Sequence, residues 1–171
     1  YSTNPTISLS STTLSFNESS DSEYYVSDEV TIKASGVNSV TISLSNAPEG
    51  TVIVGSDGTE KTTFSDGETF VVKVPQSSAT SAVTLNGTVS ATGTVLSYDR
   101  YAGGKWQDLI ALVKSNKTVT TDFSGTVNPV KRVCENTNGK YYDKDGNITD
   151  EATYKAQCET VVPVPNTASS N

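Results

Sequence analysis

The chain contains two cysteines, Cys134 and Cys158, and these are the side chains best suited to covalent chemistry. Thiols can ligate a metal, act as nucleophiles or pair with each other. Two cysteines cannot supply a four-thiolate zinc site, and the sequence has 0 histidines, which excludes a Ser-His-Asp triad, an imidazole base and a His-ligated metal. Because two cysteines in an exported chain usually pair, we expect a structural disulfide. We expect no catalytic residues, metal or cofactor.

Three aromatic side chains, Tyr98, Tyr101 and Trp106, flank the pair Gly103-Gly104. Aromatic faces next to charged groups are what carbohydrate binding uses, so these residues are candidates for a platform on which sugar rings stack. The simpler interpretation is a hairpin whose aromatic side chains cover the edge of a sheet. We favour the hairpin and keep sugar binding as the alternative.

Acidic residues recur in sequences typical of turns. Residues 143–147 read Asp-Lys-Asp-Gly-Asn, but an EF-hand calcium loop requires Gly at its sixth position and Glu at its twelfth, where this chain has Ile148 and Tyr154. We therefore interpret this segment as an Asp-Gly hairpin turn. The same interpretation, as solvated charge in turns, applies to two acidic pairs: Asp57/Glu60 and Asp66/Glu68.

The composition excludes several classes of partner. The 171 residues include 12 Lys+Arg against 19 Asp+Glu, which gives a net charge of −7 at pH 7. Nucleic acids and anionic membranes bind clustered Lys and Arg, so we expect neither as a partner. The longest apolar run, Leu109 to Val113, has five residues. Because a membrane span needs about 18, we expect no membrane insertion of this chain.

The first 128 residues carry the pattern of half-buried strands. Val30, Ile32 and Ala34 fall on one face of an expected strand, and Thr31 and Lys33 on the other. Similar segments recur with turn signals every 8–12 residues. Together they give nine or ten short strands, of which the last three are expected at 95–101, 107–113 and 118–123.

This pattern predicts an all-β chain that folds as an Ig-like antiparallel β-sandwich over residues 1–128, because no helical period separates the strands. The alternation also predicts which side chains share the core. They are Val30, Ile32, Val40, Ile42, Leu44, Phe70, Val72, Val83, Leu85 and Val89.

The composition changes at Asn128-Pro129. Residues 129–160 hold both cysteines, a hairpin turn and a short helical segment for which Thr149 is a candidate cap. We expect a small disulfide-stapled module here. Residues 161–171 form a Pro-punctuated extended tail.

The first segment resembles a β-rich segment of Gram-positive surface adhesins that carry a Cys–Gln thioester domain. The resemblance covers about residues 6–125 and rests on residues 41–51, 57–58, 64–70, 72–75 and 106–112. It implies a β-sandwich from such an adhesin. The thioester chemistry requires an aromatic-Cys motif and a Thr-Gln-x-Ala motif. Here Gln107 follows Trp106 and no Cys precedes it, so no thioester function is implied.

Sandwiches of this kind often contain a Lys–Asn isopeptide bond, which requires a lysine that faces apolar side chains. Lys33 and Lys73 both fall on the outward faces of their expected strands. We therefore do not expect such a bond at either lysine.

The tail resembles a variant of the sortase sorting motif, whose usual form is Leu-Pro-x-Thr-Gly. Here the sequence is Val164-Pro165-Asn166-Thr167-Ala168. The resemblance implies that sortase joins Thr167 to peptidoglycan, and Cys-bounded modules often precede such signals. The alternative is a terminus with a chance Pro-x-Thr-Ala sequence.

The sequence as a whole predicts a non-enzymatic, extracellular bacterial protein on the cell wall or cell surface. It would be an adhesin stalk or an adhesion module with a host protein or glycan as ligand. The alternative is a secreted carbohydrate-binding module that uses Tyr98, Tyr101 and Trp106.

Overall fold

The computed structural model describes residues 4–100 and 110–159, with side chains at all of these positions except 97–100 and 110–113. The chain divides into two compact units, Tyr1–Asn128 and Pro129–Asn171. No helix in the described residues is long and apolar enough to cross a membrane.

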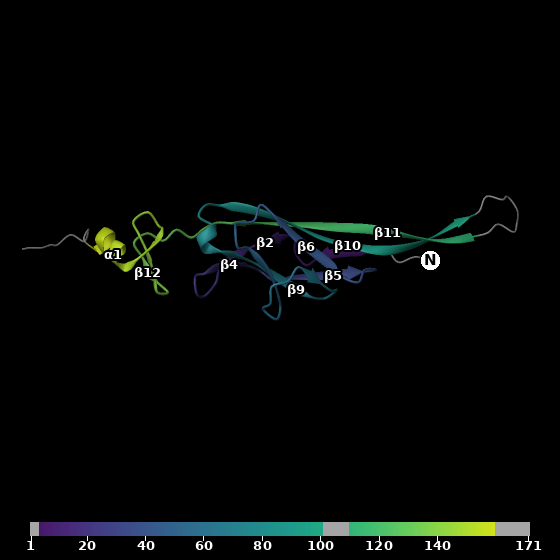
Figure 1. The fold of residues 1–171 in the computed structure, drawn as a ribbon, viewed down its shortest axis with the longest axis horizontal. Helices are drawn as coiled ribbons and strands as arrows, with labels where there is room; N and C mark the ends of the chain where they lie inside the picture. Colours follow the sequence, from purple (N-terminus) through teal and green to yellow (C-terminus); the bar gives the residue numbers. More distant parts are fainter. Residues whose placement is uncertain (1–3, 101–109, 160–171) are drawn as a thin grey trace, which may run out of the picture. The chain divides into compact units, whose positions relative to one another are not determined.

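The first unit is a sandwich of two β-sheets, as the sequence predicts (Figure 1). One sheet has six strands, and its central strand β9 pairs with β4 and then β5 on one side and with β7 on the other. The hydrogen-bonded path runs through β1 (Thr6–Leu9), β5 (Val30–Ser35), β9 (Thr69–Pro75), β4 (Tyr24–Ser27) and β3 (Phe16–Glu18). In this path β5 and β4 pair with successive parts of the same edge of β9, and β7 (Val52–Gly55) pairs with its other edge.

The second sheet has five strands, in the order β2 (Thr13–Leu14), β11 (Ile110–Val127), β10 (Val83–Arg100), β6 (Val40–Ser45) and β8 (Thr63–Phe64). Its pairs are antiparallel except for β2 and β11, which run parallel. A 3-10 turn, η1 (Gln76–Ser78), follows β9.

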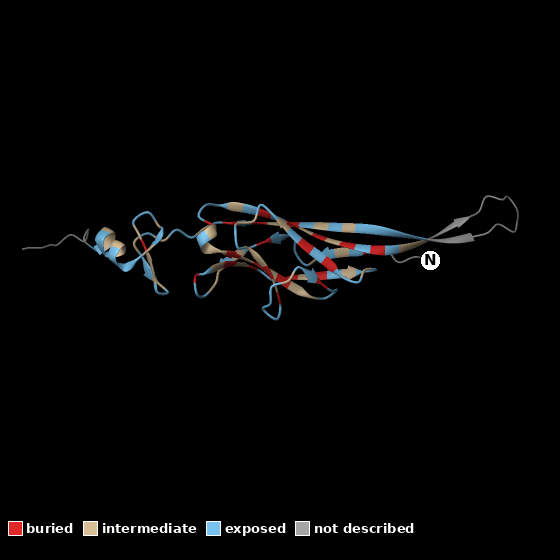
Figure 2. Cartoon of the chain, viewed as in Figure 1, coloured by how far each residue is buried: buried red, intermediate tan, exposed pale blue. Residues whose placement is uncertain are grey.

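The core lies between the two sheets, where buried side chains alternate with exposed ones along each strand (Figure 2). The predicted alternation is confirmed: eight of the ten predicted core residues are buried, and Leu44 and Val83 pack against them half-buried. Phe70 joins the sheets, because its ring lies 5.9 Å from that of Phe64 on β8 and 5.4 Å from that of Phe123 on β11.

The prediction of three short strands after residue 94 is wrong. β10 and β11 are single strands of 18 residues each, and they form one antiparallel hairpin. Gly93 looks like a turn in the sequence, but it lies within β10 where the carbonyl of Gly36 and the ring of Pro5 pack so closely that a Cβ would overlap them. The polar run 114–117 looks like a loop because it is exposed on both faces of β11.

The second unit contains a three-stranded antiparallel sheet and one helix. The strands are β12 (Asn136–Thr137), β13 (Lys140–Tyr142) and β14 (Ile148–Thr149), with β13 in the middle. Helix α1 (Glu151–Tyr154) continues as a π-helical turn, η2 (Lys155–Glu159). The predicted cap is one residue too early: Asp150, not Thr149, accepts the N–H of Thr153, at 2.7 Å.

Candidate functional site

The outward face of the five-stranded sheet is polar up to the Thr94–Asn116 pair of the β10–β11 hairpin, beyond which Leu96 and Lys114 form the next outward pair. Up to the Thr94–Asn116 pair it carries hydroxyl and amide side chains and a single carboxylate, because the outward positions of the five strands are occupied almost entirely by Thr and Ser. We call it the hydroxyl face. Its residues are Thr13, Thr41, Ser43, Ser45, Thr63, Thr84, Asn86, Thr88, Ser90, Thr92, Thr94, Asn116, Thr118, Thr120, Asp122, Ser124 and Thr126.

Hydrogen bonds between facing side chains order this surface along the β10–β11 hairpin. The hydroxyls of Thr84 and Thr126 are 2.8 Å apart, and those of Thr92 and Thr118 are also 2.8 Å apart. Midway between them, Thr88 donates to the Asp122 carboxylate at 3.1 Å. These pairs lie directly opposite each other in the ladder, so each adds a cross-strand contact to the backbone pairing.

A shallow groove of about 540 Å³ lies on the hydroxyl face. One row of side chains crosses it on four adjacent strands: Thr13, Ser124, Asn86 and Ser45. Asp122 lines it from the next row. Within the described part of the chain, the Asn86 side-chain amide has no hydrogen-bond partner, so it is available to a ligand. Amide, hydroxyl and carboxylate groups together can donate to and accept from a neutral polyhydroxyl compound.

One of the three aromatic candidates falls within a described strand. Tyr98 lies on β10 opposite Leu112, but its side chain is outside the described residues. Tyr101 and Trp106 fall in the connection between the two strands and also lie outside the described residues. The structure thus assigns Tyr98 to a strand and leaves the sugar-stacking interpretation a prediction.

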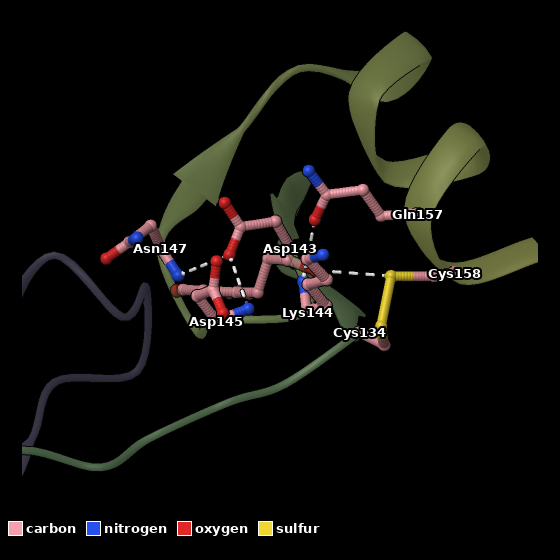
Figure 3. Close-up of a disulfide and its surroundings, with 8 residues drawn as sticks. Cys134, Asp143, Lys144, Asp145, Asn147, Gln157 and Cys158 are labelled. Carbon is pink, nitrogen blue, oxygen red and sulfur yellow. Dashed lines mark hydrogen bonds between the residues drawn. A yellow bond between two sulfur atoms is a disulfide. The ribbon is translucent and has the colours of Figure 1, made fainter.

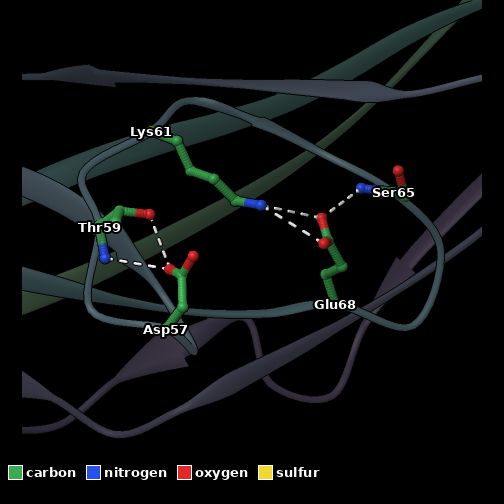
Figure 4. Close-up of polar contacts among 5 residues, drawn as sticks. All are labelled: Asp57, Thr59, Lys61, Ser65 and Glu68. Atoms are coloured by element: carbon green, nitrogen blue, oxygen red, sulfur yellow. Dashed lines mark hydrogen bonds and ion pairs between the residues drawn. The ribbon is translucent and has the colours of Figure 1, made fainter.

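One carboxylate of each acidic pair, Asp57 and Glu68, supports a turn (Figure 4). Asp57 accepts the N–H of Thr59 at 3.0 Å and its hydroxyl at 2.7 Å, and these hydrogen bonds lower the pKa of Asp57. Glu68 accepts the N–H of Ser65 at 2.8 Å and pairs with Lys61 at 3.2 Å. The hydrogen bond from Ser65, followed by that from Lys61, lowers the pKa of Glu68.

Asp66 links its turn to β5, because its carboxylate accepts the backbone N–H of Ala34 at 2.8 Å. Glu60 pairs with Val54 through an isolated backbone bridge. Neither contact brings two carboxylates together as an acid–base pair would require. In the described residues, no three His, Cys, Asp or Glu side chains gather in a way that could hold a metal ion.

The predicted disulfide is present in the second unit, with the Cα atoms of Cys134 and Cys158 5.5 Å apart (Figure 3). It joins Cys134, two residues before β12, to the π-helical turn. The ring of Tyr141 on β13 lies 5.1 Å from that of Tyr154 on α1. The disulfide and this aromatic pair together hold the helix on the small sheet.

The segment that superficially looks like a calcium loop is a hairpin turn. Asp143 accepts the N–H groups of Asp145 and Asn147, each at 2.9 Å, and the N–H of Gly146 bonds to the Asp143 carbonyl at 3.0 Å. Lys144 donates its N–H to the side chain of Gln157 at 3.0 Å, which ties the turn to the helical segment (Figure 3). The carboxylate of Asp143 therefore organises its own turn.

The lysines considered for an isopeptide bond lie as the alternation predicts. Lys33 is exposed, and the Lys73 ammonium lies 4.4 Å from the centre of the Tyr24 ring on the outward side of the six-stranded sheet. This is a cation–π arrangement. The residues of the sorting-like motif, 164–168, lie outside the described residues.

Comparison with known proteins gives a likeness in structure. No family model and no curated protein matches the sequence. The Bacillus anthracis TIE protein matches with a TM-score of 0.51 and 24% identity, over 72% of this chain and 24% of that one. The thioester domain of the Enterococcus faecium TIE86 protein matches with a TM-score of 0.54 and 19% identity, over 74% of this chain and 45% of that one.

The chain shares its fold with part of the TIE protein and with part of the thioester domain of TIE86. The resemblance that the sequence predicts is confirmed for the fold. The chain spans less than half the length of either solved protein. Both of its cysteines are in the disulfide, so no thiol is left to form a Cys–Gln thioester within it.

The hydroxyl face and its groove were missed at the sequence level. Ser and Thr recur at the outward positions of these strands, and this pattern in the sequence predicts a hydroxyl-rich face. The groove itself depends on which strands are neighbours: Thr13 lies next to Ser124, and Asn86 next to Ser45. Alternation within one strand predicts the face on which a side chain lies, but not its neighbour on another strand.

Proposed function

We propose that this chain is a non-enzymatic adhesion-type module of an extracellular bacterial surface protein. The observation that carries the proposal is its structural likeness to the TIE protein and to the thioester domain of TIE86. The disulfide is in keeping with an oxidising, extracellular environment.

This module acts without thioester chemistry of its own, because both cysteines are paired. Two roles are then open to it. As a stalk, it holds another adhesive part of the protein away from the cell. As an adhesin, it binds a host protein or glycan non-covalently.

A domain replacement in the source bacterium tests both roles. Deletion of the gene is expected to reduce adherence to host surfaces, and the intact gene is expected to restore it. A gene in which residues 4–128 are replaced by an unrelated β-sandwich of similar length restores adherence if the module is a stalk and fails to restore it if the module is the adhesin. Full adherence after deletion of the gene contradicts the proposal.

We further propose that Thr167 is the residue by which sortase links the protein to peptidoglycan. Pro165 keeps the segment extended, and Ala168 supplies a small residue after the Thr. Thr167→Ala is expected to move the protein from the muramidase-released wall fraction to the culture medium or the membrane. A reading frame without an apolar stretch of about 15–20 residues and then Lys or Arg downstream of the motif rules this out.

Carbohydrate binding is a second candidate function, and the groove on the hydroxyl face favours it. Its groups suit a neutral sugar, and Asp122 is the one charged residue of that face. A glycan array with the whole chain is the test. Loss of binding in Trp106→Ala assigns binding to the hairpin aromatics, loss in Asn86→Ala assigns it to the groove, and no bound glycan excludes the candidate.

A further inference from the structure

The outward face of the six-stranded sheet carries apolar side chains where β4, β9 and β7 lie side by side. The outward positions there are half-buried, in contrast to the polar positions of the hydroxyl face. We call this group of residues the valine patch: Tyr24, Val26, Val52, Val54, Val71 and Pro75. Strand propensity alone does not account for these residues, because Thr also favours strands and occupies such positions on the other sheet.

The strand register places one row of the patch between two acidic residues. Val71 on β9 lies directly opposite Val54 on β7. Val54 in turn pairs with Glu60 through the isolated bridge, and the register of β4 with β9, continued past the end of β4, places Asp28 opposite Val71. The row therefore crosses the sheet as two valines with a carboxylate at each end.

Both carboxylates lie on the outward side of the sheet. Ser27 is buried, so the next residue, Asp28, falls on the outward side, and its N–H continues the ladder by bonding to the Ser15 carbonyl at 3.0 Å. Asp28 and Glu60 are exposed, and within the described residues neither carboxylate has a hydrogen-bond or ion-pair partner. Three strand spacings separate the two residues, which is about 14 Å.

The lysines of this part of the sheet do not neutralise the two carboxylates. Lys73 lies in the next row of the patch, but its ammonium is 4.4 Å from the centre of the Tyr24 ring, on the side away from Asp28. Lys61 pairs with Glu68 at 3.2 Å. The row thus remains an apolar strip with a negative charge at each end.

These charges indicate what kind of molecule covers the strip. The chain has a net charge of −7. A second copy, a nucleic acid or an anionic membrane carries charge of the same sign and is repelled. An amphipathic segment with two cations about 14 Å apart and aliphatic side chains between them matches the strip in charge and in polarity. On an α-helix, residues about nine positions apart have this spacing, because each residue adds about 1.5 Å.

We propose that the valine patch binds a basic amphipathic segment of another protein. Aliphatic side chains of that segment pack on Val54 and Val71, and a Lys or Arg pairs with each of Asp28 and Glu60. The inference deepens the proposed adhesion function, on which it rests for its biological setting, because it names the chemistry of a protein ligand. The strip is smaller than a standard protein interface, so a single contact is weak and reversible.

Titration of the isotope-labelled whole chain with synthetic peptides, followed by NMR, tests the proposal. The probe is a helical peptide of about 14 residues, about 21 Å long, with Leu on one face and Lys on the other. It is expected to bind with a Kd of about 0.1–1 mM and to shift the methyl signals of Val54 and Val71. Two matched peptides, one with Glu in place of Lys and one with Ser in place of Leu, are expected to bind about tenfold more weakly or not at all.

A double variant of the chain tests the contribution of the two carboxylates. Asp28→Asn with Glu60→Gln is expected to weaken binding of the Lys peptide about threefold or more, because both ion pairs are lost. The matched control is Asp145→Asn with Glu159→Gln, which removes two exposed carboxylates of the second unit and changes the net charge equally. This control is expected to change the Kd less than about twofold.

A second double variant tests the apolar contact. Val54→Thr with Val71→Thr keeps the shape of both side chains and is expected to weaken binding about fivefold. The matched control is Val130→Thr with Val133→Thr, whose side chains in the second unit are 48% and 47% exposed, and it is expected to leave the Kd unchanged.

Several results overturn the proposal. One is a Lys peptide that does not bind, or that leaves the methyl signals of Val54 and Val71 unshifted. Another is equal binding of the Glu peptide, or an equal loss of binding in a control variant. A free chain in which these methyl groups already contact the Trp106 ring or a second copy also overturns it, because another occupant then covers the patch. Deletion of the gene tests the adhesion function separately, so the two can fail independently.

Discussion

At the scale of single residues, one glycine allows the aromatic contact between the two sheets. Gly87 on β10 lies directly opposite Phe123 on β11, and the Phe123 ring covers it so closely that a Cβ at this position would overlap the ring. The same ring contacts Phe70 of the opposite sheet. A side chain at position 87 therefore displaces an aromatic ring on which both sheets depend.

Gly87→Val is expected to lower the free energy of unfolding by about 1–3 kcal/mol, as overpacking of a core does. Chemical denaturation of the whole chain, followed by the fluorescence of the first unit, measures it. Asn86→Ala is the matched control: its side chain is exposed, and the change is expected to stay within about 0.5 kcal/mol. Equal stability of the two variants contradicts this account of Gly87.

A buried hydroxyl closes a break in the six-stranded sheet. Ser27 ends β4, and two residues separate it from the start of β5. Its hydroxyl accepts the N–H of Val72 on β9 at 2.8 Å in a buried position. Ser27→Ala leaves that N–H without a partner, which is expected to cost about 1–3 kcal/mol. Ser43→Ala on the exposed hydroxyl face is the control, and thermal unfolding of both variants decides between them.

At the scale of elements, the turns that connect β7, β8 and β9 depend on ionised carboxylates. The pKa values of Asp57 and Glu68 are lowered from 3.8 and 4.5 by their hydrogen bonds. A lowered folded-state pKa contributes stability that is present above the ordinary pKa and lost as the pH falls through the folded-state value. The stability of the first unit is therefore expected to decline below about pH 4.5, the ordinary value for Glu68.

Asp57→Asn together with Glu68→Gln is expected to flatten this decline, because neither amide titrates. Unfolding midpoints measured from pH 6 to pH 2.5, about the range in which carboxylates titrate, show the difference between the wild-type and double-variant curves. The effect is expected to be small, since both carboxylates are exposed to water. An identical pH dependence in both proteins is the result that contradicts it.

The elements also show how far the sequence predicts the fold. Alternation in β5, β6 and β9 is sufficient to place Val30, Ile42 and Val72 in the core. It fails for the β10–β11 hairpin, because beyond the flanking strands both faces meet water and no alternation is required. The groove on the hydroxyl face could not be predicted either, since it depends on the pairing of residues far apart in the chain, such as Thr13 and Ser124.

At the scale of the whole molecule, the two units differ in what stabilises them. The first has a core of buried apolar side chains from both sheets, whereas among the described residues of the second the buried hydrophobic side chain is Tyr142. A small unit with so little core depends on a covalent link. The Cys134–Cys158 bond closes a loop with a sequence separation of 24.

Reduction, or the double change Cys134→Ser and Cys158→Ser, is expected to unfold the second unit and leave the first intact. In the chain-entropy model a loop of this length contributes about 3–4 kcal/mol. Limited proteolysis with mass spectrometry reads out both units at once. New cleavage confined to the second unit supports the prediction, and two titratable thiols in the native protein contradict it.

The parallel pairing of β2 with β11 has a mechanical consequence. β2 lies near the start of the first unit and β11 ends it, and both strands run in the same direction. When the two ends of this unit are pulled apart, tension reaches β2 once β1, which precedes it in the chain, has left β5. β2 is then drawn backward and β11 forward along their common axis. The hydrogen bonds between Thr13–Leu14 and Ser124–Gly125, and the bond from the Ser124 N–H to the Thr12 carbonyl, are then loaded in shear and must break together. The first unit should therefore resist tension along the chain more strongly than it resists the peeling of a single strand.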